Sequence, residues 1–256
     1  MDTRKPETIK YEIRENVAYV TLNRPDKLNA IDTQMKNELF EAFIDVKENP
    51  EVWIAVITGA GRAFSVGHDL VEMATNVSGG RSTDDLYVYQ STIFKPIIAS
   101  INGFCLAQGA GIALCSDIRI ASDQVKLGWP QVKRGISSIS GPTLLAHGVP
   151  FNVAMQALMT GELFDAPEAH RVGLVNLVVP HDQLEARTQD MVDRIRVNAP
   201  VAMRAIKEVA VRGLDLNLEQ RVRLARFAAD VVKQSADAKE GLLAFREKRQ
   251  PVWQGR

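Results

Sequence analysis

The chain has 256 residues, of which 46% are hydrophobic, and its 31 basic residues are balanced by 31 acidic ones. A chain of this length and apolar content can bury the core of one large domain. The absence of net charge argues against nucleic acid as the main partner, because such partners favour a strongly basic face, and it fits a protein that self-associates.

The sequence shows no sign of a membrane span or of secretion. Residues 1–10 are polar, carry mixed charge and lack the apolar segment of a signal peptide. No run approaches the roughly 20 apolar residues that span a bilayer. Cys105 and Cys115 lie in apolar surroundings and are expected to be free thiols in a reducing compartment rather than a disulfide. We therefore expect a soluble cytoplasmic protein.

The first elements in chain order are a β-hairpin and a helix. Apolar and polar residues alternate over 11–14 and 17–23 on either side of Glu15-Asn16, which predicts two paired strands. Asp32 is placed to cap a helix over residues 33–48. The residues that recur at helical spacing on the buried face of this helix are Met35, Leu39, Phe43 and Val46.

A strand, a loop, a helix and two more strands are predicted next. The continuous apolar run over 52–58 suits a strand that is buried on both faces. Residues 73–85 contain Gly79-Gly80 and many small polar side chains, which predicts a loop, either beside a pocket or on the ordinary surface. A helix should follow and stop at Lys95-Pro96, before strands over 97–101 and 117–121.

The chain from Pro142 onward is expected to be mostly helical, apart from a short strand over 174–179. Strands that alternate with helices predict an α/β core with parallel strands, whose loops build sites at the strand ends. We divide the chain into an α/β core over residues 1–198 and a helical C-terminal region over residues 199–256.

Two glycine-bearing loops, residues 63–70 and 102–111, each follow a predicted strand and lead toward a probable helix. Together they could direct two backbone N–H groups at one oxygen atom, which is the arrangement that stabilises an enolate or another oxyanion. The alternative is a pair of tight turns whose glycines only relieve steric strain.

Around these loops the chain resembles the crotonase, or enoyl-CoA hydratase/isomerase, superfamily over nearly its whole length. The resemblance implies a spiral core of stacked ββα turns and a C-terminal region that builds trimers, or hexamers as dimers of trimers. It also implies an enzyme that binds acyl-CoA thioesters and stabilises an enolate. The order and spacing of these segments carry it: Asn23-Arg24-Pro25 through Asn29-Ala30, residues 63–70, Lys95-Pro96 through Asp117-Ile118-Arg119, Gly128-Trp129-Pro130-Gln131, Leu158-Met159-Thr160-Gly161, residues 169–175, and Phe245-Arg246-Glu247-Lys248-Arg249.

The resemblance assigns the two oxyanion donors to the backbone N–H groups of His68 and Gln108. Gln108 lies near the start of a helix that is expected to begin around Gly109, so the helix dipole would add to the stabilisation. The imidazole of His68 is a separate matter. It either faces the thioester pocket and acts near neutral pH, or it is a packed and hydrogen-bonded side chain.

Three positions where the family places a reacting carboxylate carry none here. The glutamates of hydratases match Gly111 and Gln131, and the carboxylate of some isomerases matches Ile139. A glutamine can hold a water molecule but is a poor general base, which argues against simple hydration.

Two alternatives to hydration follow. Decarboxylation of a malonyl-type thioester needs no base, and a decarboxylase of this family also has a histidine after the loop glycine. The other alternative is an acyl-CoA-binding protein without catalysis. Near these positions Ser137, Ser138 and Ser140 are expected to cap the next helix rather than to react.

The resemblance also implies a set of residues that bind the substrate. Trp129 would line the acyl pocket or belong to the core, and Lys27 would meet phosphate. The C-terminal positions would reach coenzyme A, sometimes from a neighbouring subunit. No metal, no cofactor apart from the coenzyme A of the substrate, and no nucleic-acid or membrane partner is expected. The full set of residues that the resemblance implies for binding the acyl-CoA substrate is Arg24, Lys27, Leu28, Ala30, Val66, Gly67, Asp69, Leu70, Gly109, Trp129, Phe245 and Lys248.

Overall fold

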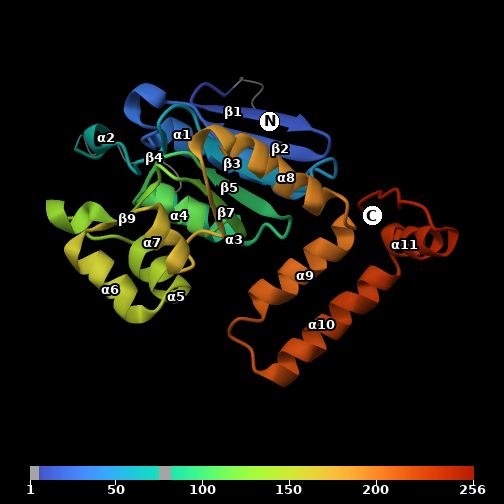
Figure 1. Ribbon diagram of the computed structural model, residues 1–256. Helices are drawn as coiled ribbons and strands as arrows, with labels where there is room; N and C mark the ends of the chain where they lie inside the picture. The colour runs from blue at the N-terminus through green and yellow to red at the C-terminus, as the bar shows by residue number, and fades with distance from the viewer. Residues whose placement is uncertain (1–5, 75–81) are drawn as a thin grey trace.

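The computed structural model describes residues 6–74 and 82–256 and contains two β-sheets flanked by helices (Figure 1). The larger sheet has the strand order β1-β2-β3-β5-β7-β10, and the smaller sheet has the order β4-β6-β8-β9. The strands of the larger sheet are β1 (Ile9–Arg14), β2 (Val17–Leu22), β3 (Ile54–Gly59), β5 (Ile97–Ile101), β7 (Ile118–Ser122) and β10 (Leu177–Val179). Those of the smaller sheet are β4 (Ala63–Ser65), β6 (Phe104–Leu106), β8 (Lys126–Gly128) and β9 (Leu163–Phe164).

Successive strands alternate between the two sheets. β3, β5 and β7 of the larger sheet are each followed directly by β4, β6 and β8 of the smaller one. Strands from successive turns lie parallel within each sheet. Each turn of the chain therefore adds one strand to each sheet, which confirms the predicted α/β fold of stacked ββα turns.

The N-terminal predictions are confirmed. β1 and β2 pair as an antiparallel hairpin around Glu15 and Asn16, both of which have positive φ. The carboxylate of Asp32 accepts a hydrogen bond of 2.8 Å from the backbone N–H of Met35, so that α1 (Thr33–Glu48) begins as expected. The predicted inner face of α1 is buried.

The C-terminal region after residue 199 is mainly helical, as predicted, and its last residues, 250–256, have no regular secondary structure. Figure 1 shows α9 and α10 extending away from the sheets as an antiparallel pair, with α11 next to the end of α10. The remaining helices and helical turns are η1 (Pro25–Lys27), α2 (Leu70–Ala74), α3 (Thr83–Ser91), α4 (Gln108–Leu114), η2 (Pro130–Arg134), η3 (Gly141–Leu145), α5 (Ala146–Gly148), α6 (Phe151–Thr160), α7 (Ala166–Arg171), η4 (His181–Gln183), α8 (Leu184–Arg196), α9 (Pro200–Arg212), α10 (Leu218–Lys233) and α11 (Ala236–Glu247).

Several predicted boundaries shift by one to four residues, among them the start of β3 at Ile54, and one predicted loop differs from the structure. α3 ends at Ser91, before Lys95-Pro96, and β10 begins at Leu177 because the two preceding apolar residues bond back to the end of α7. The predicted loop over 73–85 begins and ends in helix, since Met73 belongs to α2 and residues from Thr83 belong to α3. Its centre, 75–81, lies outside the described residues.

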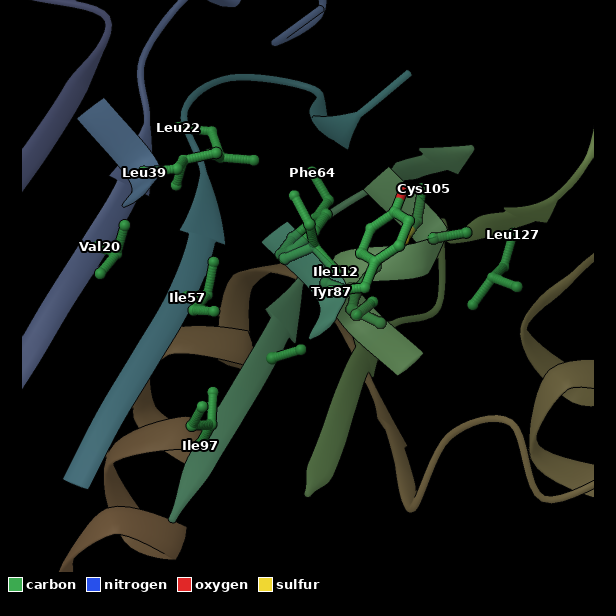
Figure 2. Packing of buried hydrophobic residues seen from close by; sticks show 14 of the residues in the cluster. Val20, Leu22, Leu39, Ile57, Phe64, Tyr87, Ile97, Cys105, Ile112 and Leu127 are labelled. Atoms are coloured by element: carbon green, nitrogen blue, oxygen red, sulfur yellow. The ribbon is translucent and has the colours of Figure 1, made fainter. Parts of the chain in front are cut away.

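The main core lies between the larger sheet and the helices α1, α3 and α4. Figure 2 shows Tyr87 of α3 among Phe64, Cys105 and Ile112, which come from β4, β6 and α4. On the other face of the sheet a smaller apolar cluster packs against α8. Cys105 and Cys115 are free thiols, as expected, and burial raises the pKa of Cys115 to about 12.

Candidate active site

A cleft of about 570 Å³ opens where the two glycine-bearing loops meet. Larger hollows lie beside α8 and beside α9 and α10, and neither is lined by a predicted site residue. The predicted residues that line the cleft are Lys27, Leu28, Ala30, Val66, His68, Asp69, Leu70, Gln108 and Gln131. The structure therefore brings most of the predicted site together.

The backbones of the two loops touch, which requires glycine at two positions. Gly67 has φ +91°, and a Cβ there would lie 2.7 Å from the Cβ of Ala107 and 3.1 Å from the backbone N of Gln108. A Cβ on Gly109 would lie 2.5 Å from the carbonyl oxygen of Ser65. Here the glycines do more than relieve turn strain, because they let β4 approach the first turn of α4.

Two backbone N–H groups are left without a protein acceptor at this junction. Ile31 and His68 form a parallel bridge, in which Ile31 bonds with the residues on either side of His68. The N–H of His68 therefore points away from Ile31. Gln108 begins α4, so its N–H has no acceptor within the helix. Neither N–H has an acceptor elsewhere among the described residues. Two such donors can receive one negatively charged oxygen.

The side chains of His68 and Gln108 meet in the cleft. The Nε2 atoms of the two residues are 2.6 Å apart, so the amide N–H of Gln108 donates to a neutral imidazole in the assigned orientation. The amide oxygen of Gln108 is buried and finds no partner within the part of the chain that the structure describes. Burial, together with Lys36, lowers the pKa of His68 below its ordinary value of 6.5, against the opposing effect of Asp84 and Glu72. The ring both lines the cleft and is hydrogen-bonded.

Arg24 links the segment that holds Lys27, Leu28 and Ala30, which is predicted to bind coenzyme A, to the first glycine-bearing loop. Its guanidinium Nη1 donates to the carbonyl oxygen of Ala30 at 2.6 Å and lies 3.1 Å from Asp69 and 3.2 Å from Asp32. Although partial burial opposes it, the hydrogen bond from Arg24 holds the pKa of Asp69 below its usual range. Asp69 also accepts from the N–H of Val71, as expected of a capping residue. Arg24 is thus engaged within the protein, whereas Lys27 lines the cleft.

Gly111 faces a space that is already filled. A Cβ at this position would lie 2.7 Å from the Tyr87 ring and 2.8 Å from the Cβ of Ser140. Tyr87 is 6% exposed, and its hydroxyl lies 3.5 Å from the carbonyl oxygen of Gln108. The sequence interpretation missed Tyr87. The one available signal was the missing side chain at Gly111, because a core without that side chain must be filled by another one.

Gln131 brings an unused acceptor to the cleft, since its amide oxygen is buried and has no hydrogen-bond partner among the described residues. Ile139 also lines the cleft but is half exposed and offers no polar group. Of the three serines predicted to cap the next helix, Ser138 accepts a hydrogen bond of 3.0 Å from the N–H of Gly141, whereas the N-cap Ser140 makes no capping bond with its side chain. Ser140 instead bonds to Trp129 and to Ala107.

Six predicted binding residues do not line the cleft: Arg24, Gly67 and Gly109, described above, and Trp129, Phe245 and Lys248. Trp129 is 1% exposed and belongs to the core, which fits the second of the two interpretations offered for it. Phe245 lies on α11 and is 86% exposed, and Lys248 is the C-cap of that helix. Neither lines the cleft of its own chain. Their predicted contact with coenzyme A would have to come from a neighbouring subunit.

Within residues 6–74 and 82–256, no group of three or more histidine, cysteine, aspartate or glutamate side chains is placed to hold a metal ion. No helix within the same two ranges combines the length and apolar character that crossing a membrane requires.

The chain is similar in sequence and structure to known proteins. The sequence profile of the enoyl-CoA hydratase/isomerase family matches residues 12–256. The chain is 35% identical to an (E)-benzylidenesuccinyl-CoA hydratase of Thauera aromatica, over 96% of this chain and 99% of that protein. It is also 35% identical to a carnitinyl-CoA dehydratase of Proteus mirabilis, over 95% and 97% of the two chains. An enoyl-CoA hydratase/isomerase structure from Mycobacterium paratuberculosis superposes with a TM-score of 0.90 at 34% identity, covering 98% of this chain and 100% of that one.

Proposed function

Because the chain belongs to the enoyl-CoA hydratase/isomerase family and is an enzyme of acyl-CoA thioesters, we propose that it holds a thioester enolate between the N–H groups of His68 and Gln108. The observation that carries the proposal is the pair of unpaired N–H groups at the junction of β4 and α4, beside the cleft. Donors of this kind act on charge that develops in the transition state, and one of them is worth about 3–4 kcal/mol.

We propose addition of water to an enoyl-CoA, or its elimination, as the reaction. The protein would do this without the two glutamates, so other groups must move the proton and hold the water. The neutral imidazole of His68 can transfer the proton near neutral pH. The buried, unpartnered amide oxygen of Gln131 can accept a hydrogen bond from the water. The hydratase and dehydratase names of the two relatives support this choice.

Decarboxylation of a malonyl-type thioester is the second candidate, and a specific observation favours it. Among the described residues that line the cleft, Asp69 is the only carboxylate, and it is paired with Arg24. Lys27 and Arg134 line the same cleft and can attract an anionic acyl group. Loss of carbon dioxide would generate the enolate without a base.

We also propose that the C-terminal helices contact second and third copies of this chain, as in a homotrimer or a hexamer built from two trimers. α9, α10 and α11 carry large apolar side chains that are mostly solvent-exposed in one chain. This surface includes Ile206, Phe227, Val231, Leu242 and Phe245. A neighbouring copy that covers it could carry Phe245 and Lys248 to the nucleotide end of the cleft.

Purified protein tests these proposals when it is given matched enoyl-CoA and malonyl-type CoA thioesters in deuterated water. Hydration consumes the conjugated thioester and places deuterium at C2 of a hydroxyacyl product. Decarboxylation releases carbon dioxide and places deuterium at C2 of a saturated product. Binding of every thioester without turnover of any would overturn both reactions and leave a binding protein.

A further inference from the structure

The peptide between Ala107 and Gln108 is held firmly at its carbonyl end. Ala107 has φ 53° and ψ −115°, a conformation that residues with a Cβ rarely adopt. Its carbonyl oxygen accepts two hydrogen bonds, one of 3.0 Å from the N–H of Gly111 and one of 3.1 Å from the hydroxyl of Ser140. In a trans peptide the N–H points opposite to the carbonyl. Bonds that fix this carbonyl therefore fix the direction of the Gln108 N–H.

The direction of the Ser140 hydroxyl is in turn set by Trp129. The indole Nε1 lies 2.9 Å from the serine oxygen, and an indole can only donate. The serine oxygen is therefore the acceptor of that bond, and its single proton is free to go to Ala107. Ser140 is 2% exposed and Trp129 is 1% exposed, so little water competes for these groups.

Tyr87 packs beside Ser140 in front of Gly111. Its hydroxyl lies 3.5 Å from the carbonyl oxygen of Gln108, and burial raises the pKa of Tyr87, so that the hydroxyl stays protonated and can donate to that carbonyl. The Tyr87 ring and the Ser140 Cβ occupy the space in front of Gly111. A side chain at position 111 would therefore displace the groups that hold the peptide.

We propose that Ser140 is a positioning residue that, with Trp129 and Tyr87, directs the N–H of Gln108 into the cleft. The inference rests on the proposed function, in which this N–H receives the thioester oxygen. Gly111 provides the space that the arrangement needs. Ser140 acts through the peptide and not on the reacting carbon atoms.

Infrared spectroscopy of bound acetyl-CoA, labelled with ¹³C at the thioester carbonyl, tests the proposal. Acetyl is the smallest acyl group with a methyl, so it requires little of the acyl pocket. Binding to the unmodified enzyme should lower the carbonyl stretching frequency, because hydrogen bonds from both N–H groups weaken the C=O bond. Ser140→Ala should lose a large part of this shift while binding acetyl-CoA nearly as well.

Turnover should follow the same pattern. We expect kcat of Ser140→Ala to fall about 10-fold or more while KM changes little. This loss of kcat should stay below the roughly 10²- to 10³-fold loss that removal of a donor causes. Trp129→Phe should change the shift in the same direction, since it frees the serine hydroxyl to turn. Ser116→Ala is the matched control. It removes another buried serine hydroxyl that donates to a carbonyl of α4, that of Ile112 at 3.2 Å.

Distinct results would overturn the inference and the proposed function. A full shift and full kcat in Ser140→Ala, or in Trp129→Phe if the first variant does not fold, would overturn the positioning role. An equal loss in Ser116→Ala would reduce the effect to general destabilisation and would also overturn it. If the unmodified enzyme binds acetyl-CoA with no shift at all, the oxyanion site itself fails.

Discussion

At the scale of single residues, Gly111 stands at one of the two positions where the family resemblance predicts a glutamate. Restoring the carboxylate by Gly111→Glu should not create a better hydratase, because the new side chain would meet Tyr87 and Ser140 within 2.8 Å. Overpacking of a core costs about 1–3 kcal/mol. We expect a variant that unfolds at lower denaturant concentration and turns over enoyl-CoA more slowly, as measured by denaturation and by loss of the conjugated thioester.

Gly148→Glu is the matched control for that substitution. A Cβ on Gly148 meets no atom within 4 Å, and its φ is not positive. This variant should keep the midpoint and the rate of the unmodified protein. Faster hydration by Gly111→Glu would instead mean that the space can open and that the glutamate was simply lost.

The pH dependence of the reaction and of stability should be set by a single side chain, the imidazole of His68. Its pKa is lowered from 6.5, mainly by burial, so the folded protein binds fewer protons than the unfolded chain between the lowered pKa and 6.5. Stability should therefore fall as the pH drops below about 6.5. The rate should be flat near neutral pH and fall only below 6.5, where the ring becomes protonated.

His68→Gln separates the two roles assigned to this residue. It keeps the backbone N–H, so acetyl-CoA should still show its carbonyl shift, but the acid limb of the kcat/KM profile should disappear and the rate should be low throughout. His147→Gln, which changes an exposed histidine outside the cleft, should leave the profile unchanged. An unchanged acid limb in His68→Gln would assign the proton transfer to another group.

At the scale of elements, the site depends on the contact between β4 and α4. Gly109→Ala would place a Cβ 2.5 Å from the carbonyl oxygen of Ser65, and backbone cannot move aside as a flexible side chain can. We expect α4 to shift away from β4, with kcat reduced at least about 10-fold and affinity for coenzyme A retained. Measurement of kcat alongside the Kd of coenzyme A checks this, and equal loss of both would point to unfolding of the loop.

The elements were predictable where their causes are local. Asp32, three residues before Met35, caps α1 within one turn, and Glu15-Asn16 supports a two-residue hairpin turn. The two glycine-bearing loops were predicted from the residues themselves, whereas the assignment of the donors to His68 and Gln108 came from the resemblance. The contacts that tune the site are not local, since Tyr87 and Gly111 are separated by 23 residues, and Arg24 reaches Asp69 across 45 positions. No single-sequence pattern encodes such a pairing.

At the scale of the whole molecule, the C-terminal helices should determine assembly. Phe227 on α10 is 71% exposed, and Phe227→Asp would place a charge in the proposed contact with a second copy. We expect sedimentation to show a shift from an oligomer toward the monomer. Phe151→Asp is the control, because Phe151 is 68% exposed but lies on α6, outside the proposed surface. An oligomer that survives Phe227→Asp would place the contact elsewhere.

The two groups proposed to hold the enolate belong to the main chain, and this bears on how such a protein can change over generations. Among the standard amino acids only proline lacks a backbone N–H, so almost any single substitution at position 68 or 108 keeps the donor itself. Side chains around the cleft can therefore drift and acquire new chemistry while the intermediate stays bound. For the same reason, an inhibitor that relied on these two main-chain donors would leave the enzyme few single-step routes to resistance.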